Sequence, residues 1–380
     1  MYKGYKIRLF PTSEQEELFW KHIYACKFIW NYMLNKQNEN YKNGDKYLSS
    51  YDMVKLLKPL KNDGIHEWLY EVSNASLQRI CIDIDKSFKL FFKHKQGYPK
   101  FKSKKCFKKI YPVRTSDGAL YFDSKTVFIS KIGKVIYKTD YNIPYGKNIT
   151  FYNAHISYEN NKWILTFQLK FEIQNQQLND FNMGIDLGIK ELAVVAVGDQ
   201  KIVYHNINKS KRIKMLEQKS KHIQRCINRK YRTNGNYKKT NAIIKYEKIQ
   251  KKICYKIENI RRNYIHQITH ELVSLKPQRV IMEDLNISGM MKNKYLSKAI
   301  QDQCLYEFIR QMKYKCEWAG IEFVQADRFY PSSKTCSQCG EIKKDLKLSD
   351  RVYKCHCCGL EIDRDYNAAI NLMNYSCSTE

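Results

Sequence analysis

Two groups of residues near the C-terminal end could carry chemistry, and they adjoin each other. In the segment 355–370, CHCCGLEIDRDYNAAI, closely spaced cysteines run directly into Glu361, Asp363 and Asp365. Thiolates at such spacing are typical of structural zinc, whereas carboxylates are typical of magnesium sites and of catalysis. The arrangement predicts a metal clip placed beside a reactive site.

The cysteines form two pairs with the spacing of a structural zinc site. Within each pair two residues separate the cysteines, 15 residues separate the pairs, and a glycine follows each pair. The expected ligands are Cys336, Cys339, Cys355 and Cys358. Four thiolates complete a tetrahedral shell, so we expect one structural Zn²⁺. Cys357 and His356 lie inside the second pair and should be poor ligands. Disulfides are the structural alternative, which a reducing compartment disfavours.

Two further acids stand in apolar strand-like segments. Asp186 lies within MGIDLGI, and Glu283 ends the apolar run of VIMEDL. An acid in such a place must be solvated or bind a cation, because burying it unpaired is costly. Carboxylates that converge from two strands and from the acidic helix start EIDRDYNAAINL could hold two Mg²⁺ ions. Such ions activate water and stabilise the leaving oxygen in phosphodiester hydrolysis.

The composition indicates a polyanionic partner. The 380 residues carry 67 Lys and Arg against 38 Asp and Glu, a formal net charge of +29, with 43% hydrophobic residues. The length suits two or three domains with real cores. Such a basic chain is expected to bind nucleic acid, since each phosphate that is neutralised releases a condensed counterion. Together with the acids, this charge favours a nuclease.

The first of two strongly basic segments combines lysines with aromatic rings. Residues 86–109 contain ten lysines, six aromatic residues and no acid. This mixture suits phosphate neutralisation with base stacking, although a plain basic loop remains the alternative. The candidate nucleic-acid-binding residues here are Lys93, Lys95, Tyr98, Lys100, Phe101 and Lys102.

The second basic segment has the pattern of long helices, over residues 207–275. Between Lys201 and Arg262 there are 20 Lys and Arg and three Glu. That bias exceeds what an ordinary solvated helix face needs and indicates a helical arm lying along nucleic acid. Its candidate contacts are Arg225, Arg229 and Arg232.

The chain shows no sign of a membrane segment or of a secretory leader. No apolar run approaches the roughly 20 residues that span a bilayer, and the N-terminal residues lack the apolar core of a signal peptide. We therefore expect a cytoplasmic, nucleoid-associated protein with no membrane partner. The remaining isolated cysteines are expected to be reduced and to fill cores. They are Cys26, Cys81, Cys106, Cys226, Cys254, Cys304 and Cys316.

Local patterns predict the elements that carry these residues. A strand ends at Pro11, and Ser13 with Glu16 forms a capping-box pattern for a first helix; SNASLQRICIDIDKSFKLFF predicts another helix, and residues 110–172 read as β-rich. From Met183, MGIDLGIKELAVVAVGDQKIVYHN predicts three strands. PQRVIMEDLN and IEFVQAD predict two more, and KAIQDQCLYEFIRQMKYKCEWAG predicts one helix closed by Gly320.

These motifs resemble a known family. GIDLGIKELAVVA, VIMEDLNISGM and SSKTCSQCG with RVYKCHCCGLEIDRDYNAAINL resemble the three split RuvC motifs and the embedded zinc finger of transposon-encoded TnpB proteins. TnpB proteins are compact relatives of type V CRISPR effector nucleases. KIRLFPTSEQEELF and FFKHKQGYPKFKSK are similar to the N-terminal part of the family, so the resemblance extends over nearly the whole chain.

The resemblance implies an α/β plus α+β multidomain fold. Residues 1–10 and 100–180 would form a β-barrel wedge domain, and 11–99 a helical recognition lobe. Residues 181–380 would form an RNase-H-like RuvC nuclease domain, with the basic helices 207–275 and a zinc finger at 330–360 inserted.

The resemblance also implies a function: Mg²⁺-dependent cleavage of double-stranded DNA at sites matched by a guide RNA. Carried over by motif, Asp186, Glu283 and Asp365 are the catalytic, Mg²⁺-binding carboxylates, with Asp363 the alternative to Asp365. Two other functions stay open: an RNA-guided DNA-binding repressor without cleavage, and a transposase that uses the same acids without a guide. Oligomeric state, guide sequence and target-adjacent motif cannot be read from the residues.

Overall fold

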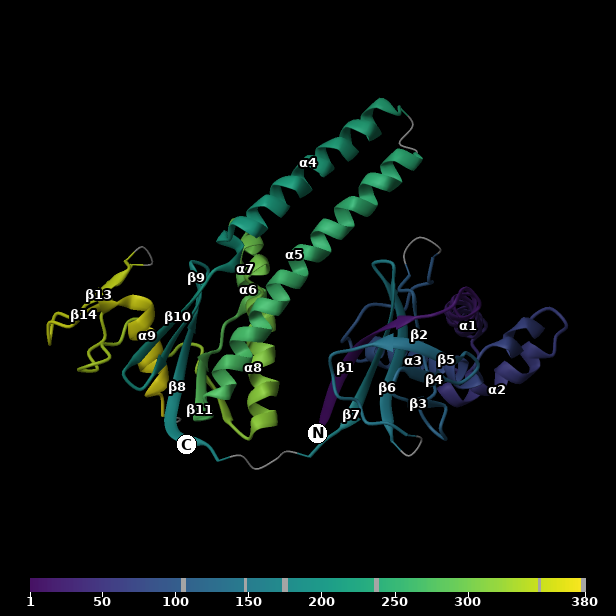
Figure 1. Cartoon of the computed structure of the whole chain (residues 1–380), viewed down its shortest axis with the longest axis horizontal. Coiled ribbons are helices and arrows are strands. Elements are labelled where there is room, and N and C mark those ends of the chain that lie inside the picture. The colour runs from purple at the N-terminus through teal and green to yellow at the C-terminus, as the bar shows by residue number, and fades with distance from the viewer. Residues whose placement is uncertain (104–106, 147–148, 173–176, 236–238, 348–349, 377–380) are drawn as a thin grey trace. The chain divides into compact units, whose positions relative to one another are not determined.

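The computed structural model describes residues 1–103, 107–146, 149–172, 177–235, 239–347 and 350–376. Cys106 lies outside this part of the chain, as do a few residues of the segments 86–109, 207–275 and 330–360. The chain forms two compact units, Met1–Glu172 and Ile173–Glu380, which run from purple to blue and from teal to yellow in Figure 1. Each unit has its own sheet and is described by itself.

The first unit starts with a strand, continues through helices and returns to strands. Its elements are β1 (Tyr2–Phe10), α1 (Ser13–Asn43), α2 (Ser50–Lys61), the 3₁₀ helix η1 (Glu67–Glu71), α3 (Asn74–Phe92), β2 (Ile110–Pro112), β3 (Leu120–Phe122), β4 (Thr126–Ile129), β5 (Gly133–Lys138), β6 (Phe151–Glu159) and β7 (Lys162–Lys170). The antiparallel sheet has the order β2-β6-β7-β1-β5-β4-β3. Among the described residues, β2 and β3 stand at the two ends of this sheet and do not pair with each other. The described sheet is therefore not closed into a barrel.

The sheet and the helices of the first unit share one hydrophobic core. Ile7 and Leu9 of β1 are buried, because alternate side chains of a strand point to the same face. They belong to the same cluster as Phe19 of α1 and Leu77 of α3. The strands and the helical segment 11–99 are therefore packed together as one body.

Helix α1 begins one residue earlier than its capping-box pattern predicts. Thr12 is the N-cap: its hydroxyl accepts a hydrogen bond from the Gln15 backbone N–H at 3.3 Å, and the Gln15 side chain accepts one from the Thr12 N–H at 3.1 Å. The spacing of a capping box occurs twice in TSEQE, and the pair formed by Ser13 and Glu16 is the one not used.

The second unit carries a five-stranded mixed sheet. Its elements are β8 (Asn179–Leu187), β9 (Glu191–Val197), β10 (Gln200–His205), η2 (Ile207–Lys209), α4 (Lys211–Thr233), α5 (Asn241–Ser274), β11 (Pro277–Glu283), α6 (Ile287–Met290), α7 (Ser297–Gln303), α8 (Leu305–Ala319), β12 (Glu322–Ala326), β13 (Val352–Lys354), β14 (Glu361–Asp363) and α9 (Arg364–Met373). The order is β10-β9-β8-β11-β12. β8, β9 and β10 are antiparallel neighbours, whereas β11 runs parallel to β8 and to β12. The five predicted strands are thus confirmed.

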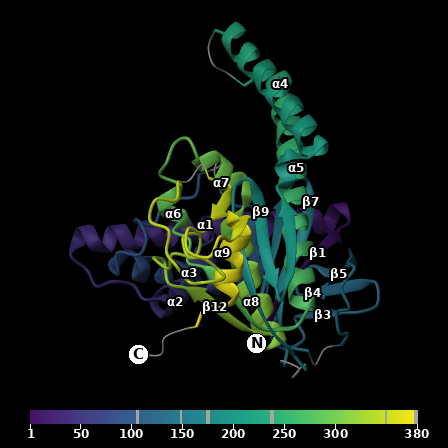
Figure 2. The ribbon, with the colours of Figure 1, turned by 90° about the vertical axis from the view of Figure 1, so that its left-hand side faces the viewer.

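Helices cover both faces of this sheet. Ile185 and Met282 point into a core shared with α5 and α8, whereas Val194 and Ala196 contact α9 through Ala369 on the other face. Figure 1 shows α9, in yellow, on one side of the strands and α8 on the other, and Figure 2 views the unit from the side of α9. Because strand residues alternate, Asp186 belongs to the face that α9 covers.

The long helices predicted between residues 207 and 275 are α4 and α5. They lie side by side and pack through an isoleucine-rich seam that includes Ile213, Ile227 and Ile257. Figure 1 shows the pair running away from the sheet of this unit. We call α4 and the half of α5 that packs on it the basic arm.

The single helix predicted to end at Gly320 is instead two helices. Cys304, with φ 55°, adopts the left-handed conformation and separates α7 from α8. Beside the break, the buried Gln303 side chain donates hydrogen bonds to the carbonyl oxygens of Gly188 at 3.2 Å and Ile189 at 3.0 Å. Gly320 closes α8 in the left-handed conformation, as predicted.

Core filling describes only some of the isolated cysteines. Cys26, Cys81 and Cys316 are buried, and burial raises the pKa of each thiol to about 12. Cys254, in contrast, is exposed. Within the described residues no helix is both long enough and apolar enough to cross a bilayer.

Candidate active site and metal centre

Asp186 and Glu283 come from neighbouring parallel strands. The register between β8 and β11 pairs Ile185 with Met282, so the acid that follows each of them stands at the same level of the sheet. Both acids lie on the face opposite the core formed by Ile185 and Met282. The sheet therefore brings the two predicted carboxylates together.

Asp365 reaches the same place from α9. It lies in the first turn of this helix, and α9 can approach β8 closely because residue 184 is glycine. A Cβ atom on Gly184 would lie 2.0 Å from the Ala369 carbonyl oxygen and 2.3 Å from the Met373 backbone nitrogen. Gly184 and Asp186 share one face of β8, so the close contact sets α9 directly beside the acid.

Asp363, the alternative to Asp365 as the third carboxylate, has a structural role. It is the N-cap of α9: its carboxylate accepts a hydrogen bond from the Tyr366 backbone N–H at 3.0 Å. The side chain is about half exposed and lies 3.4 Å from Nζ of Lys201. An N-cap carboxylate satisfies the free N–H groups of the first turn, so Asp363 already has structural partners.

The electrostatics of the cluster are unfavourable for anions. Burial raises the pKa of Asp186 far above its usual range, and the charges of Asp365 and Glu283 raise it further, against a smaller opposing effect of Arg364. Burial, followed by the charge of Asp284, raises the pKa of Glu283. Among the described residues, no hydrogen bond or ion pair is formed by the carboxylates of Asp186 or Glu283. Arg364 lies 3.4 Å from Asp365, yet the cluster as a whole remains short of positive charge.

These carboxylates fit a hard divalent cation by the chemistry of their donor atoms. Mg²⁺ prefers oxygen ligands, and a cation would offset the repulsion between like charges. Among the described residues, only the four cysteines bring three or more candidate ligand atoms within 4.8 Å of one another. The acids are therefore spaced more widely than the thiols.

The cysteine cluster has the geometry of a tetrathiolate site. The four Sγ atoms of the predicted ligands lie within 4.8 Å of one another. We call residues 334–343 and 352–361, which carry the two cysteine turns, the zinc knuckle. Its turns bend at Gly340 and Gly359, with φ of 78° and 74°, values that favour glycine. Backbone N–H groups of Cys358 and Cys357 lower the pKa of Cys355 to about 6. A four-cysteine cluster of this kind suits structural zinc, and Cys357 is exposed outside it.

The sequence analysis predicted no role for two residues that lie beside the cysteine cluster. Asn367 and Asn371 of α9 are buried and hydrogen-bonded to backbone groups of residues 332–337, in and just before the first cysteine turn. The only signal in the sequence is a pair of amides four residues apart in the apolar segment YNAAINL. That spacing places both on one side of a helix.

The basic segment after α3 divides into exposed and packed side chains. Lys93, Lys95, Lys100 and Phe101 are exposed. Tyr98 is partly used in packing, edge-on against Phe88 and Phe91 with its hydroxyl on Asn38.

The side chain of Lys102 packs over the ring of Trp30 in the first unit. Its Nζ lies 3.9 Å from the centroid of the Trp30 ring, its backbone N–H donates to Asn31 Oδ1 at 2.8 Å, and burial lowers its pKa. A lysine held over an indole ring gains a cation–π contact. Lys102 is thus less available to phosphate than its exposed neighbours.

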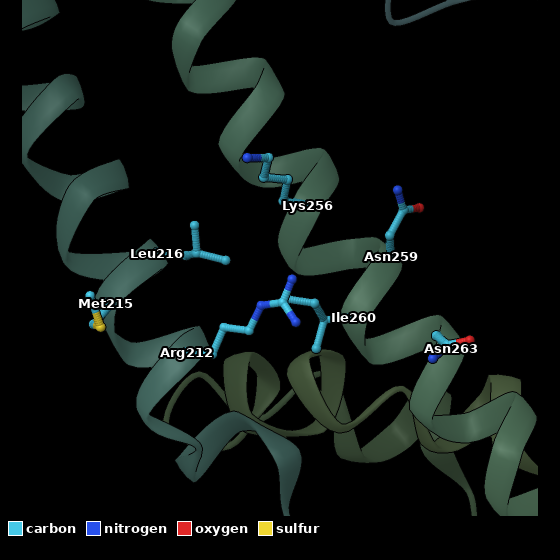
Figure 3. Close-up of a pocket in the computed structure, with 7 residues that line it drawn as sticks. All are labelled: Arg212, Met215, Leu216, Lys256, Asn259, Ile260 and Asn263. Atoms are coloured by element: carbon cyan, nitrogen blue, oxygen red, sulfur yellow. The ribbon is translucent and has the colours of Figure 1, made fainter.

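The basic arm presents its arginines to solvent. Arg225, Arg229 and Arg232 are all exposed on α4. Near the base of the arm, α4 and α5 enclose a cleft of about 470 Å³ lined by Arg212, Met215, Leu216, Lys256, Asn259, Ile260 and Asn263. Figure 3 shows Arg212 and Lys256 reaching into it from the two helices.

The mixed sheet, the helices on both of its faces and the four-cysteine cluster match the fold of a type V effector protein. A solved structure titled as a Cas12f1–sgRNA–target DNA complex aligns with a TM-score of 0.58 and 14% identity, over 98% of this chain and 99% of that one. Three family models match: "Helix-turn-helix domain" of IS605 OrfB over 1–46, "Probable transposase" OrfB_IS605 over 155–294 and "Cas12f1-like, TNB domain" over 306–372. Over most of its length the chain is therefore similar to the OrfB proteins of IS605 elements, the TnpB family.

Named relatives extend over nearly the whole chain. "Putative RNA-guided DNA endonuclease InsQ" of Escherichia coli (strain K12) is 28% identical over 98% of this chain and 91% of that protein. A protein of Streptomyces pristinaespiralis, also named "Putative RNA-guided DNA endonuclease", is 26% identical over 98% of this chain and 88% of its own length.

Proposed function

We propose that this protein is an RNA-guided DNA endonuclease of a transposable element, which cleaves phosphodiesters at guide-matched sites. The observation that carries the proposal is the cluster of Asp186, Glu283 and Asp365. These acids stand together on one face of the sheet, short of positive charge, in a chain with a net charge of +29. The names of the E. coli and Streptomyces relatives support it.

The proposed site divides the chemistry among these residues. When bound, two Mg²⁺ ions would supply an activated water and stabilise the leaving oxygen. Asp186, Glu283 and Asp365 provide the oxygen ligands and the negative charge that holds the ions. Asp363 caps α9 and keeps the first turn, with Asp365 on it, in a helical conformation. The zinc knuckle, expected to hold one Zn²⁺, contributes structure only.

The basic surfaces would bind the nucleic acids. Lys93, Lys95 and Lys100 in the first unit, and the arginines of the basic arm, are exposed cations without an apolar covering. Such side chains recognise backbone and shape, and leave sequence to base pairing between guide RNA and target strand. We therefore propose that these surfaces hold the guide RNA and the double-stranded DNA target.

Replacing a carboxylate by its amide tests the catalytic assignment. Asp186→Asn or Glu283→Gln removes the charge that offsets the metal ion, so DNA cleavage should fall by at least about 100-fold while RNA and DNA binding persist. The assay uses protein purified with its RNA and a plasmid that carries a guide-matched site, with Mg²⁺ or with chelator.

The internal control compares the two acids at the start of α9. Asp365→Asn should abolish cleavage, whereas Asp363→Asn should have a small effect, because asparagine is also a good N-cap. Cleavage that survives Asp186→Asn would contradict the active-site assignment. A larger loss from Asp363→Asn than from Asp365→Asn would exchange the roles of the two acids.

The same assay separates the two alternative functions. A repressor would bind the guide-matched site without cutting it, although all three acid positions are occupied by acids here. A transposase would act equally well after the RNA is removed. The family description "Probable transposase" over residues 155–294 keeps the second alternative in view. Sequencing the nucleic acid that copurifies with the protein distinguishes guided from unguided activity.

A further inference from the structure

We propose that Asn367 and Asn371 are positioning residues that transmit the rigidity of the zinc knuckle to Asp365. This inference rests on the proposed function, and it assigns a task to two amides that no metal ion or nucleic acid is expected to contact. The two residues would hold α9 at the distance from β8 at which the three carboxylates act as one site.

Asn367 uses both ends of its amide on the first cysteine turn. Its side chain is fully buried, with 0% exposure. Its Oδ1 accepts a hydrogen bond from the Ser337 backbone N–H at 3.0 Å, and its Nδ2 donates one to the Thr335 carbonyl oxygen at 2.7 Å. Ser337 lies between the first two cysteines. Only a side chain that presents an acceptor and a donor together can satisfy both groups.

Asn371 repeats the contact one helical turn later. Its Nδ2 donates to the carbonyl oxygens of Ser332 and Thr335, each at 2.7 Å. Two attachments spaced by one turn fix the helix against rotation about its axis as well as against sliding. Buried backbone groups that lose such partners carry a desolvation cost, so the attachments resist being broken.

The zinc knuckle is also connected to α9 directly along the chain. β14 ends at Asp363 and α9 begins at Arg364, whose backbone N–H donates to the Arg351 carbonyl oxygen at 2.8 Å. On its other side, α9 is seated on Gly184 of β8. The helix that bears Asp365 is thus held between the sheet and the knuckle, two residues from the Asn367 attachment.

This restraint has a physical task, because the carboxylates repel one another. The charges of Asp365 and Glu283 both disfavour the ionised form of Asp186. A loosely held α9 could relieve the repulsion by moving Asp365 away, which would dismantle the metal site. Neutral amides suit the restraint, since they attach the helix without adding charge beside the acids.

The test replaces each amide by leucine, a side chain of similar size without polar atoms. Full-length Asn367→Leu and Asn371→Leu proteins, purified with their RNA, are assayed for zinc content, for binding of Mn²⁺ by electron paramagnetic resonance of the free ion, and for cleavage as a function of Mg²⁺ concentration. Mutation of a residue that orients a metal ligand typically lowers metal affinity or activity by about 10–100-fold. We expect that loss in Mn²⁺ affinity and in cleavage at low Mg²⁺. Zinc content and RNA binding should be unchanged, and high Mg²⁺ should partly restore cleavage.

Controls separate this effect from general damage and from failure of the proposed function. Asn374→Leu changes an exposed asparagine at the end of the same helix and should leave every measurement unchanged. Wild-type Mn²⁺ affinity in Asn367→Leu with zinc retained would overturn the inference while leaving the endonuclease assignment intact. If the leucine variants lose zinc, Asn367→Ser and Asn371→Ser are judged by the same criteria. Absence of cleavage by the wild-type protein would instead contradict the proposed function.

Discussion

At the scale of the residue, Asp186 stands in surroundings that oppose its charge. Burial and two neighbouring acids raise its pKa above the unfolded value of 3.8. The folded chain then keeps a proton that the unfolded chain releases. Without metal, stability should fall as pH rises from the unfolded pKa toward the folded one, and it should stay low above that range.

Removing this charge should stabilise the metal-free protein. With chelator at neutral pH, Asp186→Asn should melt higher than wild type by about 2–4 °C, the shift that about 1 kcal/mol produces in a domain of this size. The difference should shrink as pH falls through about 4, because Asp186 of the wild type then becomes protonated in the unfolded state as well as in the folded one. Mg²⁺ should raise the melting temperature of the wild type more than that of the variant.

Differential scanning calorimetry across pH measures this effect. Asp180→Asn, on the exposed start of the same strand, is the matched control and should leave the melting temperature almost unchanged. A lower melting temperature for Asp186→Asn than for wild type in chelator would show that the aspartate has favourable partners in the folded protein.

Single residues were predictable where their chemistry is unusual for their setting. Asp186 and Glu283 stand out as acids in apolar strands. Asp363 is the N-cap of α9, whereas the assignment of Asp365 as the third metal ligand stays a prediction, because both residues are acids at the start of the same helix. Asn367 was missed because an amide on a mostly apolar helix face looks like an ordinary surface residue, and only tertiary contacts bury it.

At the scale of the element, the zinc knuckle is small and has few apolar side chains of its own. Its core contains Tyr353, with partly buried neighbours such as Leu346 and Ile362. We therefore expect the folding of this short segment to depend on a bound zinc ion. Metal analysis should find about one Zn per chain, and Cys336→Ser or Cys355→Ser should release it and destabilise the knuckle.

Cys357→Ser is the matched control for the zinc ligands. It lies between two of them in sequence, is exposed, and should leave the zinc content unchanged. Acidification should release zinc as the thiolates gain protons. Retention of stoichiometric zinc by a Cys336→Ser, Cys355→Ser double variant would refute the site.

Helices and strands could be predicted from the periodicity of apolar residues and from the turns between them. Prediction was less successful where tertiary contacts decide the local structure. The five strands of the second sheet follow from apolar runs and turns. The break at Cys304 does not, since the local pattern is continuous; it stands where Gln303 bonds to the loop after β8. Gly184 shows the same limit, because its need for close packing against α9 is visible only in three dimensions.

At the scale of the whole molecule, charge is the property that composition predicted directly. The exposed cations of the first unit and of the basic arm should bind phosphates. Each phosphate that is no longer neutralised reduces the steepness of the plot of log affinity against log salt concentration by about 0.7–0.9. Changing Lys93, Lys95 and Lys100 to Glu, or Arg225, Arg229 and Arg232 to Glu, should weaken RNA binding and flatten its dependence on salt.

Filter binding across a salt series measures this slope for each set separately. Lys102→Glu serves as a contrast, because it should mainly destabilise the contact with Trp30 and alter the slope little. A slope equal to that of wild type in either triple variant would mean that those cations remain solvated. The common core of helices and sheet in the first unit, unlike its charge, was not predictable from local pattern, because it depends on which faces meet.

The central place of β1 has a consequence for how the newly made chain can fold. β1 is synthesised before the other strands of its sheet, yet it stands between β5 and β7, and the amino group of Met1 donates a hydrogen bond to the carbonyl oxygen of Phe171, 170 positions later. Long-range pairing is slow, because a long loop must close before its contacts form. Until β7 (Lys162–Lys170) has left the ribosome, β1 can pair only with β5, and its other edge stays open. During that interval the open edge is a template for aggregation, and a chaperone would act on this unit then.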